Sequence, residues 1–485
     1  MLFNSYIFIL FFFPICILGY YSFNYLRKYT CGQCFLLAMS LWFYAYFNIS
    51  YLAIILVSII INYAIYFLFS KFPSKCVRKV ILIPGLLFNI GLLIYFKYMD
   101  FFIQNINAVF HKEYALLGIL LPLGISFFTF QQISFIVDAY KGEIPQRYNI
   151  LYYASFVTFF PQLIAGPIVT HDELIPQFLD EKRKKINWGN MAMGIYIFTL
   201  GLSKKVLLAD TFGKAVTWGY NNLESLDSTN ALLVMFSYTI QIYFDFSGYC
   251  DMAIGIGKIL NIDLPVNFNS PYKALTITEF WDRWHITLTR FFTKYIYIPL
   301  GGNRKGQIRT YINIMIVFLV SGIWHGANWT FVFWGMCHGL FLVITRRFQK
   351  FFTNLHPALN WILTFSFVNI MWVFFRADSL GDAVNLLNRI ALCNFGGIST
   401  DLLSSFKLVE LEFFLRNFSI EFRYPYFLLS VFLFLSLFLI LGCKNAHEKM
   451  DSFKPSVFRI LSSAFLLVWC IFSFSDISTF LYYNF

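Results

Sequence analysis

The stretch TYINIMIVFLVSGIWHGANWTFVFWGMCHGLFLVIT, residues 310–345, contains no Asp, Glu, Lys or Arg. As a helix its 36 residues would be about 54 Å long, nearly twice the roughly 30 Å core of a bilayer. We therefore expect two spans, 311–324 and 327–345, or a span and a re-entrant segment, with His325 near the break. A polar residue at membrane depth costs free energy unless it faces protein or water, so His325 is a candidate functional residue.

The composition is that of an integral membrane protein. Hydrophobic residues make up 59% of the chain and charged residues 13%, whereas soluble domains average about 45–50% and about 25%. Apolar runs follow one another with little between them, so residues 1–485 are expected to form one all-α membrane domain. About eleven to thirteen transmembrane or re-entrant helices are predicted, at roughly 3–23, 33–48, 51–70, 80–98, 114–135, 150–168, 190–209, 229–247, 311–324, 327–345, 358–375, 424–442 and 458–474.

The net charge of +12 is explained by basic residues in short loops between the apolar runs. Such loops tend to face the cytoplasm, which places the N-terminus outside. Nucleic-acid binding would require a basic face on a soluble module, and the sequence offers none. The segment 376–425 has a mixed composition and is predicted to be extramembrane. It contains a short amphipathic helix through Ala383, Leu386, Leu387 and Ile390.

Three other stretches contain too many polar, Pro or Gly residues to form continuous lipid-facing helix: 121–140, 159–167 and 269–303. Within the third, residues 278–300 show helical periodicity. A single helix there would carry on one apolar face Phe280, Trp284, Leu288, Phe291 and Tyr295.

Two interpretations of 278–300 are open. The helix lies at the membrane interface with Arg283, Arg290 and Lys294 facing solvent or lipid phosphates. Alternatively, His285 points inward near His325, and the basic edge contacts the phosphates of an acyl carrier. Periodicity does not choose between them.

The remaining histidines are weaker candidates. His338 shares the uncharged run and is expected to pack as a hydrogen-bonded core residue. His171, His111, His356 and His447 lie in polar loops and are expected to be solvated. No metal site is expected, because the chain has neither a His-x-x-His nor a His-Glu-x-x-His motif. Ser321 lacks the Gly-x-Ser-x-Gly context of a serine nucleophile.

Six long motifs, in order along the chain, resemble the membrane-bound O-acyltransferase family, and within it the branch that acetylates alginate, peptidoglycan and other polysaccharides. They are LPLGISFFTFQQISFIVDAYKG (121–142), FFPQLIAGPI (159–168), YFDFSGYCDMAIGIGKILNI (243–262), NFNSPYKALTITEFWDRWHITLTRFFTKYIYIPLGGNRKG (267–306), SGIWHGANWTFVFWGMCHG (321–339) and WVFFRADS (372–379). The resemblance implies a family core at about 121–379 with a central tunnel.

The resemblance also implies site residues and a reaction. His325 matches the family's hallmark membrane histidine, and His285 matches its second histidine. The reaction would transfer an acetyl group from acetyl-CoA to a hydroxyl of an exported polysaccharide, with His325 as general base. His285 would position the acceptor or stabilise the oxyanion. The donor's phosphates are assigned by charge to Arg283, Arg290, Lys294 and Arg304.

The resemblance further implies a multi-pass protein in the bacterial inner membrane, surrounded by membrane lipids and working with an extracytoplasmic acetyltransferase partner. The acceptor stays open among alginate, peptidoglycan, cellulose and capsular glycans, as does the length of the acyl chain. Two other functions remain possible on the sequence: a transporter or flippase for a lipid-linked glycan, which also needs intramembrane polar groups, and a non-catalytic membrane scaffold.

Overall fold

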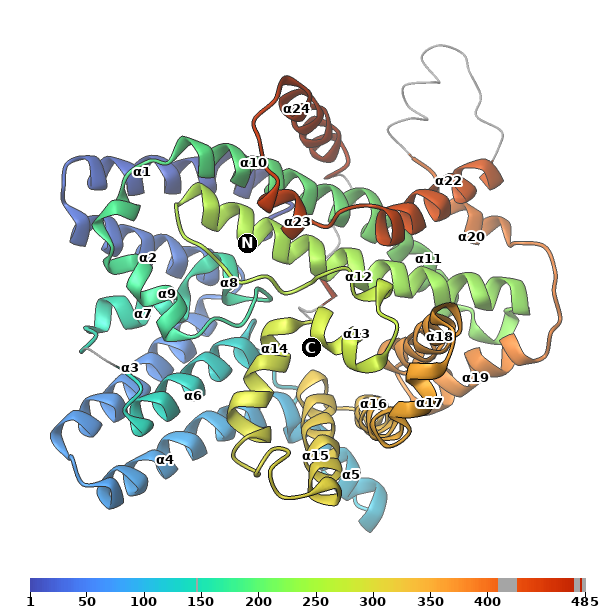
Figure 1. The fold of residues 1–485 in the computed structure, drawn as a ribbon, viewed down its shortest axis with the longest axis horizontal. Coiled ribbons are helices and arrows are strands. Elements are labelled where there is room, and N and C mark those ends of the chain that lie inside the picture. Colours follow the sequence, from blue (N-terminus) through green and yellow to red (C-terminus); the bar gives the residue numbers. More distant parts are fainter. Residues whose placement is uncertain (145–146, 409–424, 475–479, 482–485) are drawn as a thin grey trace. The chain divides into compact units, whose positions relative to one another are not determined.

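The computed structural model describes residues 1–144, 147–408, 425–474 and 480–481 (Figure 1). Helices are the regular elements of this part of the chain, together with one isolated antiparallel bridge between Phe268 and Trp284. The helices group into two compact units. The first unit comprises Met1–Phe198 and Cys250–Pro265, and the second comprises Thr199–Tyr249 and Val266–Phe485.

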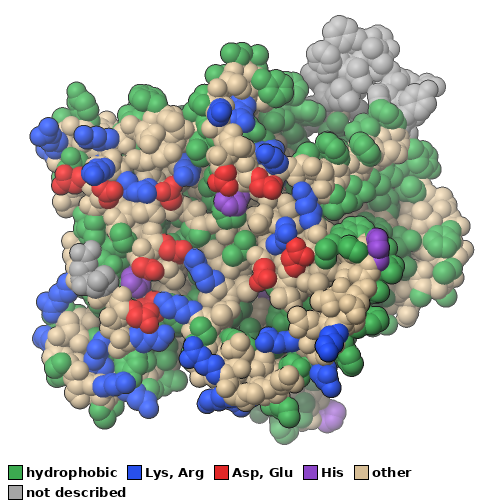
Figure 2. All heavy atoms as spheres, viewed as in Figure 1, with side chains coloured by type: hydrophobic (Ala, Val, Ile, Leu, Met, Phe, Trp, Pro, Cys, Tyr) green, Lys and Arg blue, Asp and Glu red, His purple; other side chains and the backbone are tan. Residues whose placement is uncertain are grey.

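Seven helical stretches among the described residues are long and apolar enough to cross a membrane. They are Phe8–Tyr25, Ile49–Lys71, Lys75–Phe110, Trp188–Asn221, Gln307–His325, Trp329–Arg347 and Pro357–Arg376. Shorter apolar helices occupy Tyr426–Gly442 and Val457–Phe472. Large apolar side chains on these helices are exposed, among them Leu18, Ile60 and Leu87, as expected for surfaces in contact with lipid (Figure 2 shows such side chains in green). The prediction of an all-α, multi-pass membrane protein is confirmed.

The first unit begins with helices that end at polar or Pro-containing loops. Asn48 caps one of them, α3, by accepting a hydrogen bond from the Ser50 N–H. Its elements are η1 (Phe8–Phe12), α1 (Phe13–Tyr25), α2 (Tyr29–Ala45), α3 (Ile49–Lys71), α4 (Lys75–Leu93), η2 (Ile94–Tyr98), α5 (Met99–Phe110), α6 (Ile125–Lys141), α7 (Ile150–Thr158), α8 (Phe160–Leu163), α9 (His171–Leu179), η3 (Glu181–Lys184) and most of α10 (Trp188–Ser203).

Two predicted spans of the first unit are interrupted. The predicted helix 114–135 begins only at Ile125, because Gly124 adopts a left-handed φ of 70° and its backbone packs against the Leu163 carbonyl. The predicted helix 150–168 breaks at Phe159, two residues before Pro161, and continues as the single turn of α8. Both breaks fall in or beside the Pro- and Gly-rich stretches that the sequence marked as discontinuous.

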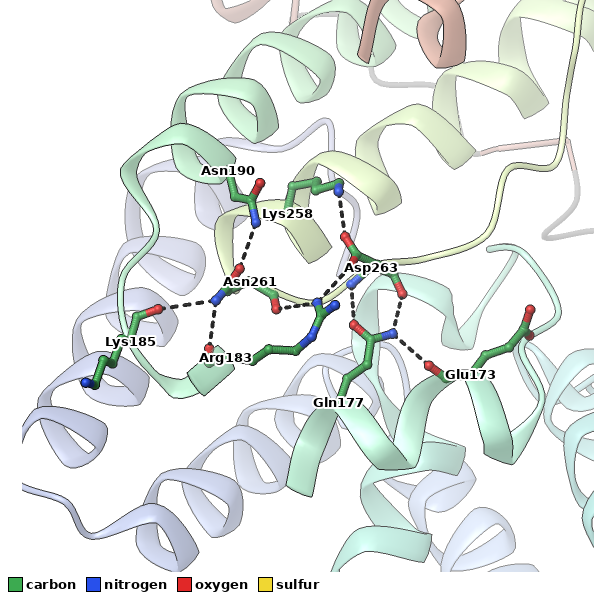
Figure 3. Close-up of polar contacts among 8 residues, drawn as sticks. All are labelled: Glu173, Gln177, Arg183, Lys185, Asn190, Lys258, Asn261 and Asp263. Carbon is green, nitrogen blue, oxygen red and sulfur yellow. Dashed lines mark hydrogen bonds and ion pairs between the residues drawn. The ribbon is translucent and has the colours of Figure 1, made fainter. Parts of the chain in front are cut away.

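A polar cluster fixes the end of the long helix α12 (Ser228–Ile259) within the first unit (Figure 3). Asp263 accepts hydrogen bonds from Lys258 Nζ (2.5 Å) and Arg183 Nη1 (2.8 Å), and its backbone N–H donates to Gln177. Asn261, in a left-handed conformation, accepts from Asn190 and donates to the Arg183 carbonyl. The cluster therefore joins the chain after α12 to α9, η3 and α10.

The second unit contains the stretch from which the sequence analysis began. Its elements are η4 (Lys204–Ala209), α11 (Asp210–Asn221), η5 (Leu223–Ser225), most of α12, η6 (Pro271–Lys273), α13 (Ile277–Arg283), α14 (Ile286–Phe292), η7 (Thr293–Tyr297), α15 (Gln307–His325), α16 (Trp329–Arg347), α17 (Gln349–Asn354), α18 (Pro357–Arg376), α19 (Leu380–Ala391), α20 (Thr400–Ser404), α22 (Pro425–Leu437), η8 (Phe438–Gly442), α23 (Ala446–Asp451) and α24 (Val457–Phe472).

The amphipathic helix expected within 376–425 is α19. Its inner face buries Ala383 and Leu386, and Ser379 caps it by accepting a hydrogen bond from the Asp382 N–H. Residues 409–424 of the predicted extramembrane segment lie outside the described residues.

Candidate active site

The expected break in the uncharged run lies directly after His325. Helix α15 ends at His325, Gly326 follows in an extended conformation, and α16 begins at Trp329. Asn328 caps α16 by accepting a hydrogen bond from the Thr330 N–H (3.1 Å), while its amide donates to the Asp378 carbonyl (2.7 Å). The turn is therefore tied to the segment that follows α18. The uncharged run divides, as predicted, into two helices, each long and apolar enough to cross a membrane.

Glycines bring α15 and α16 into close contact (Figure 1). A Cβ added to Gly322 would collide with the Phe331 carbonyl oxygen and lie 3.2 Å from Gly335 Cα. A Cβ added to Gly335 would collide with the Phe318 carbonyl oxygen. Small residues allow membrane helices to pack backbone against backbone. This close crossing holds His325 at the end of a rigid helical hairpin.

His325 is buried in an aromatic environment. Its ring centroid lies 4.9 Å from that of Trp324, 5.1 Å from Trp334 and 5.1 Å from Phe375. The three rings come from α15, α16 and α18. The imidazole of His325 is therefore enclosed by apolar rings from three helices.

The structure corrects the prediction of one continuous helix over 278–300. Helix α13 ends at Arg283 and α14 begins at Ile286, with His285 between them at a left-handed φ of 48°. Non-glycine residues seldom adopt this conformation and it costs free energy, so the surrounding structure must hold it in place. The residues predicted for the apolar face are nevertheless mostly buried, since Phe280, Trp284, Leu288 and Phe291 all lie in the core on either side of the break.

Contacts with residues 267–268 stabilise the break between α13 and α14. Phe268 and Trp284 form the antiparallel bridge, and the Ile286 N–H donates to the Asn267 carbonyl (3.0 Å). The side-chain Oδ1 of Asn267 lies 3.2 Å from His285 Nδ1 and accepts hydrogen bonds from the Thr287 N–H (3.2 Å) and hydroxyl (2.9 Å). Asn267 was not singled out by the sequence analysis. Asn267 is the first residue of the sequence NFNS at residues 267–270. Nothing in that sequence indicates a contact with His285, 18 residues further along the chain.

His285 and His325 lie against the same indole. The His285 ring is 6.2 Å from the Trp324 ring and 4.8 Å from Phe246, while His325 lies 4.9 Å from Trp324. His285 is fully buried. Its burial lowers the pKa of the imidazole to about 3, so the ring is neutral at pH 7. Of the two interpretations of this segment, the inward placement of His285 matches the structure.

A third histidine joins the same cluster. His338 on α16 lies 4.7 Å from Trp334, the ring that also contacts His325. Its Nδ1 accepts a hydrogen bond from the Trp281 indole (3.3 Å). His338 is thus the buried, hydrogen-bonded residue that the sequence predicted, and it connects α16 to α13.

The four predicted phosphate-binding residues occupy different environments. Arg283 forms an ion pair with Glu279 (2.7 Å) and donates to the Asn269 carbonyl. Arg290 and Lys294 line a cavity of about 300 Å³ on the α14–η7 side of the second unit. Arg304 lies in the turn before α15.

A neighbouring cavity of about 220 Å³ reaches α15 and contains Ser321 and Arg346 in its wall. The two cavities share Trp281, Asp282, Thr289 and Thr293, so together they border the helices that carry the histidines.

The prediction that His171 is solvated is wrong. His171 is buried in the first unit, and its Nε2 lies 3.5 Å from Asp138 Oδ2. Its ring also packs edge-on against Phe135 (5.7 Å). The polar sequence around it reflects the capping box of α9, formed by Thr170 and Glu173, rather than exposure to water.

Comparison with known proteins matches residues 141–380 to the model of the membrane-bound O-acyltransferase family. The chain is 40% identical to the peptidoglycan O-acetyltransferase of Helicobacter pylori, over 100% of this chain and 98% of that protein. The chain belongs to the membrane-bound O-acyltransferase family. The family resemblance that the motifs indicated is therefore confirmed.

Two other relatives are similar over smaller shares of the chain. A probable alginate O-acetylase of Pseudomonas aeruginosa is 37% identical, over 82% of this chain and 75% of that protein. A teichoic acid D-alanyltransferase of Bacillus subtilis is 27% identical, over 51% of this chain and 66% of that protein. Membership makes the present chain a multi-pass membrane O-acyltransferase.

Proposed function

We propose that the protein transfers an acetyl group from acetyl-CoA to hydroxyl groups of an exported cell-surface polysaccharide, and that this polysaccharide is peptidoglycan. The choice of peptidoglycan as the acceptor rests on the match to a peptidoglycan O-acetyltransferase along the whole chain. The alginate O-acetylases match over a smaller share of the chain, 82–85%. Alginate is therefore the second candidate acceptor.

His325 is the proposed general base. A hydroxyl is a poor nucleophile until a base removes its proton in the transition state, and a positioned base typically contributes about 10²–10⁴-fold. The burial of His325 among Trp324, Trp334 and Phe375 supports this role, because a neutral imidazole can accept that proton. The proton then leaves with the CoA thiol, which keeps the reaction balanced.

His285 is proposed to act in the same step, either by positioning the acceptor or by stabilising the oxyanion of the tetrahedral intermediate. Its support is its burial and its position against Trp324, the ring that His325 also contacts. Arg290 and Lys294 are the strongest candidates to hold the donor's phosphates, because they line one cavity, whereas Arg283 is already paired with Glu279.

Acetyl-CoA is cytosolic, whereas the polysaccharide is exported, so the reaction has to connect the two faces of the membrane. We place the protein in the bacterial inner membrane, with a tunnel that gives both substrates access to His325. The proposal includes a route to the polymer through an extracytoplasmic partner enzyme, in which case the hydroxyl that reacts at His325 belongs to the partner, which then passes the acetyl group to the polysaccharide. Support comes from the many candidate spans and from the bacterial relatives.

The test is the acetyl content of the muropeptides in cells that lack the gene and are complemented with wild-type or His325→Ala protein. We expect wild type to restore O-acetylation and His325→Ala to leave it undetectable, with equal amounts of protein in the membrane. His356→Ala is the matched control, because His356 is an exposed cap of α18. Normal acetylation by His325→Ala would contradict the assignment of the base.

A second assay separates the enzyme from the two other functions. Purified protein is expected to release CoA thiol from acetyl-CoA when an acceptor is supplied, and only when His325 is intact. A lipid-linked glycan transporter would show no such release, and cells lacking it would accumulate unexported precursor. If the protein were a non-catalytic scaffold, its His325→Ala variant would still restore acetylation in cells. If cells that lack the gene lose acetyl groups from alginate while their peptidoglycan is unchanged, the acceptor is alginate.

A further inference from the structure

The side-chain oxygen of Asn267 contacts several polar groups at and beside His285. Asn267 Oδ1 lies 3.2 Å from the Thr287 N–H, 2.9 Å from the Thr287 hydroxyl and 3.2 Å from His285 Nδ1. All three residues are buried, so these bonds are not exchanged freely with water. Asn267 is also held by its backbone, since its carbonyl accepts the Ile286 N–H. The side chain is therefore fixed relative to the imidazole.

This geometry determines which imidazole nitrogen carries the proton. An asparagine oxygen and nitrogen are easily confused, but a backbone N–H can only donate, so the atom facing Thr287 must be the oxygen. The same oxygen faces His285 Nδ1 and can only accept. Nδ1 must therefore donate, and in a neutral ring the lone pair then resides on Nε2. The aromatic rings around His285, Phe246 and Trp324, supply no competing charge.

We propose that Asn267 is a positioning residue that holds His285 in the Nδ1–H tautomer, so that His285 Nε2 accepts the hydrogen bond of the acceptor hydroxyl. This inference rests on the proposed function and chooses between the two roles left open for His285. A neutral ring with its lone pair on Nε2 has no proton there to donate to an oxyanion. His285 therefore orients the hydroxyl, and His325 removes its proton.

The backbone explains why this position requires such support. His285 has a left-handed φ of 48°, and its carbonyl accepts hydrogen bonds from Leu288 and Thr289 at the start of α14. Strained backbone of this kind persists only where several contacts determine it. The bridge between Phe268 and Trp284 and the Asn267 bonds supply those contacts on the opposite side.

The tautomer is measured directly by nitrogen-15 NMR of protein labelled at histidine, with the His285 signals assigned by their loss in His285→Gln. At pH 7 we expect Nδ1 to resonate as a protonated nitrogen and Nε2 as an unprotonated one. A protonated Nε2, or a cationic ring, would overturn the inference. This readout needs no substrate, so it stands or fails separately from the acetyl-transfer activity.

The kinetics of acetyl transfer by Asn267 variants test whether this residue positions His285 for the reaction. Asn267→Ala is expected to lose the fixed tautomer in the NMR spectrum and to lower kcat by about 10-fold or more. Asn267→Asp keeps an oxygen that accepts the same bonds, but its negative charge raises the pKa of His285. It is therefore expected to recover part of kcat and to move the acidic limb of the pH profile upward by about one unit or more.

The matched control is Asn269→Ala in the same segment, whose side chain accepts from Asn445 and does not contact His285. It is expected to keep the tautomer and to stay within about twofold of wild-type kcat. Equal losses in Asn267→Ala and Asn269→Ala, or a loss in Asn267→Ala with the tautomer unchanged, would show that the segment acts only as a structural support.

Discussion

At the scale of single residues, His285 makes stability depend on pH. Its pKa in the folded protein is about 3, below the ordinary 6.5, because burial disfavours the charged ring. The unfolded chain therefore binds more protons between pH 3 and 6.5, and stability falls as the pH drops through this window. At pH 5 the effect amounts to about 2 kcal/mol relative to pH 7, at 1.36 kcal/mol per unit. Thermal unfolding at the two pH values measures it.

His285→Gln is the control for this pH dependence, because glutamine does not titrate. The variant is expected to be less stable at pH 7, since it disturbs the bond to Asn267, yet to lose less stability than wild type between pH 7 and pH 5. The comparison uses the two slopes, so a general destabilisation does not affect it. Parallel slopes would mean that His285 is not the group responsible.

Single residues also show how far sequence reasoning reaches. His325 could be recognised as a polar residue in an uncharged run, and its burial follows from that setting. His171 could not, because its burial depends on Asp138, 33 positions away and in another helix. Asn267 escaped notice for the same reason. A side chain whose partner is distant in sequence leaves no periodic signal.

At the scale of elements, the α15–α16 crossing depends on its glycines. Gly322→Ala adds a methyl group where the Phe331 carbonyl and Gly335 Cα already lie, and backbone atoms cannot move aside as a side chain would. We expect a loss of about 1–3 kcal/mol in unfolding free energy and a lower activity, because His325 is one turn away. Gly91→Ala is the matched control, since Gly91 also lies in a candidate span but has no heavy atom within 4 Å of its added Cβ. Its stability is expected to stay equal to wild type or to rise slightly.

A second element-scale prediction concerns the buried ion pairs that join η4, α11 and α12. Lys205 Nζ lies 2.6 Å from Asp245 and 2.8 Å from Asp210, and Lys205 and Asp245 are almost fully buried. Lys205→Met removes the cation that contacts both carboxylates, of which Asp245 is buried, and is expected to cost about 3–5 kcal/mol. Lys204→Met, its half-buried neighbour at the wall of an apolar cavity, is expected to cost less than about 1 kcal/mol. Denaturation in detergent measures both, and equal losses would show that burial of the charge is not the cause.

Elements of strong periodicity were predictable, and the break at His285 was not. The α15–α16 hairpin follows from the length of the uncharged run and the Gly and Asn residues in its centre. The segment 278–300 has an equally clear helical period, yet it divides into α13 and α14. The period records which side chains are apolar. It does not record that Asn267 and Phe268 bind the backbone at 284–286 and stop the helix.

At the scale of the whole molecule, the basic loops predict which parts of the chain face the cytoplasm. Lys71, Lys75, Arg78 and Lys79 surround Cys76, and Arg346 and Arg347 end α16. Helix α18 then crosses from the Arg347 side, and the bond from Asn328 to Asp378 places its end level with the turn after His325. We therefore predict that the segment from Ala377 to Cys393 faces the extracytoplasmic side.

Exposed cysteines test this topology, since Cys76 and Cys393 are both exposed and the distribution of basic residues predicts that they face opposite sides of the membrane. A variant that retains only Cys393 is expected to react with a membrane-impermeant maleimide in intact cells. A variant that retains only Cys76 is expected to react only after the membrane is permeabilised. A Cys16-only variant is the control for specificity, because Cys16 is buried. Labelling of Cys76 in intact cells would reverse the orientation, and the acetyl donor would then have to reach His325 from the side of the turn at residues 326–328.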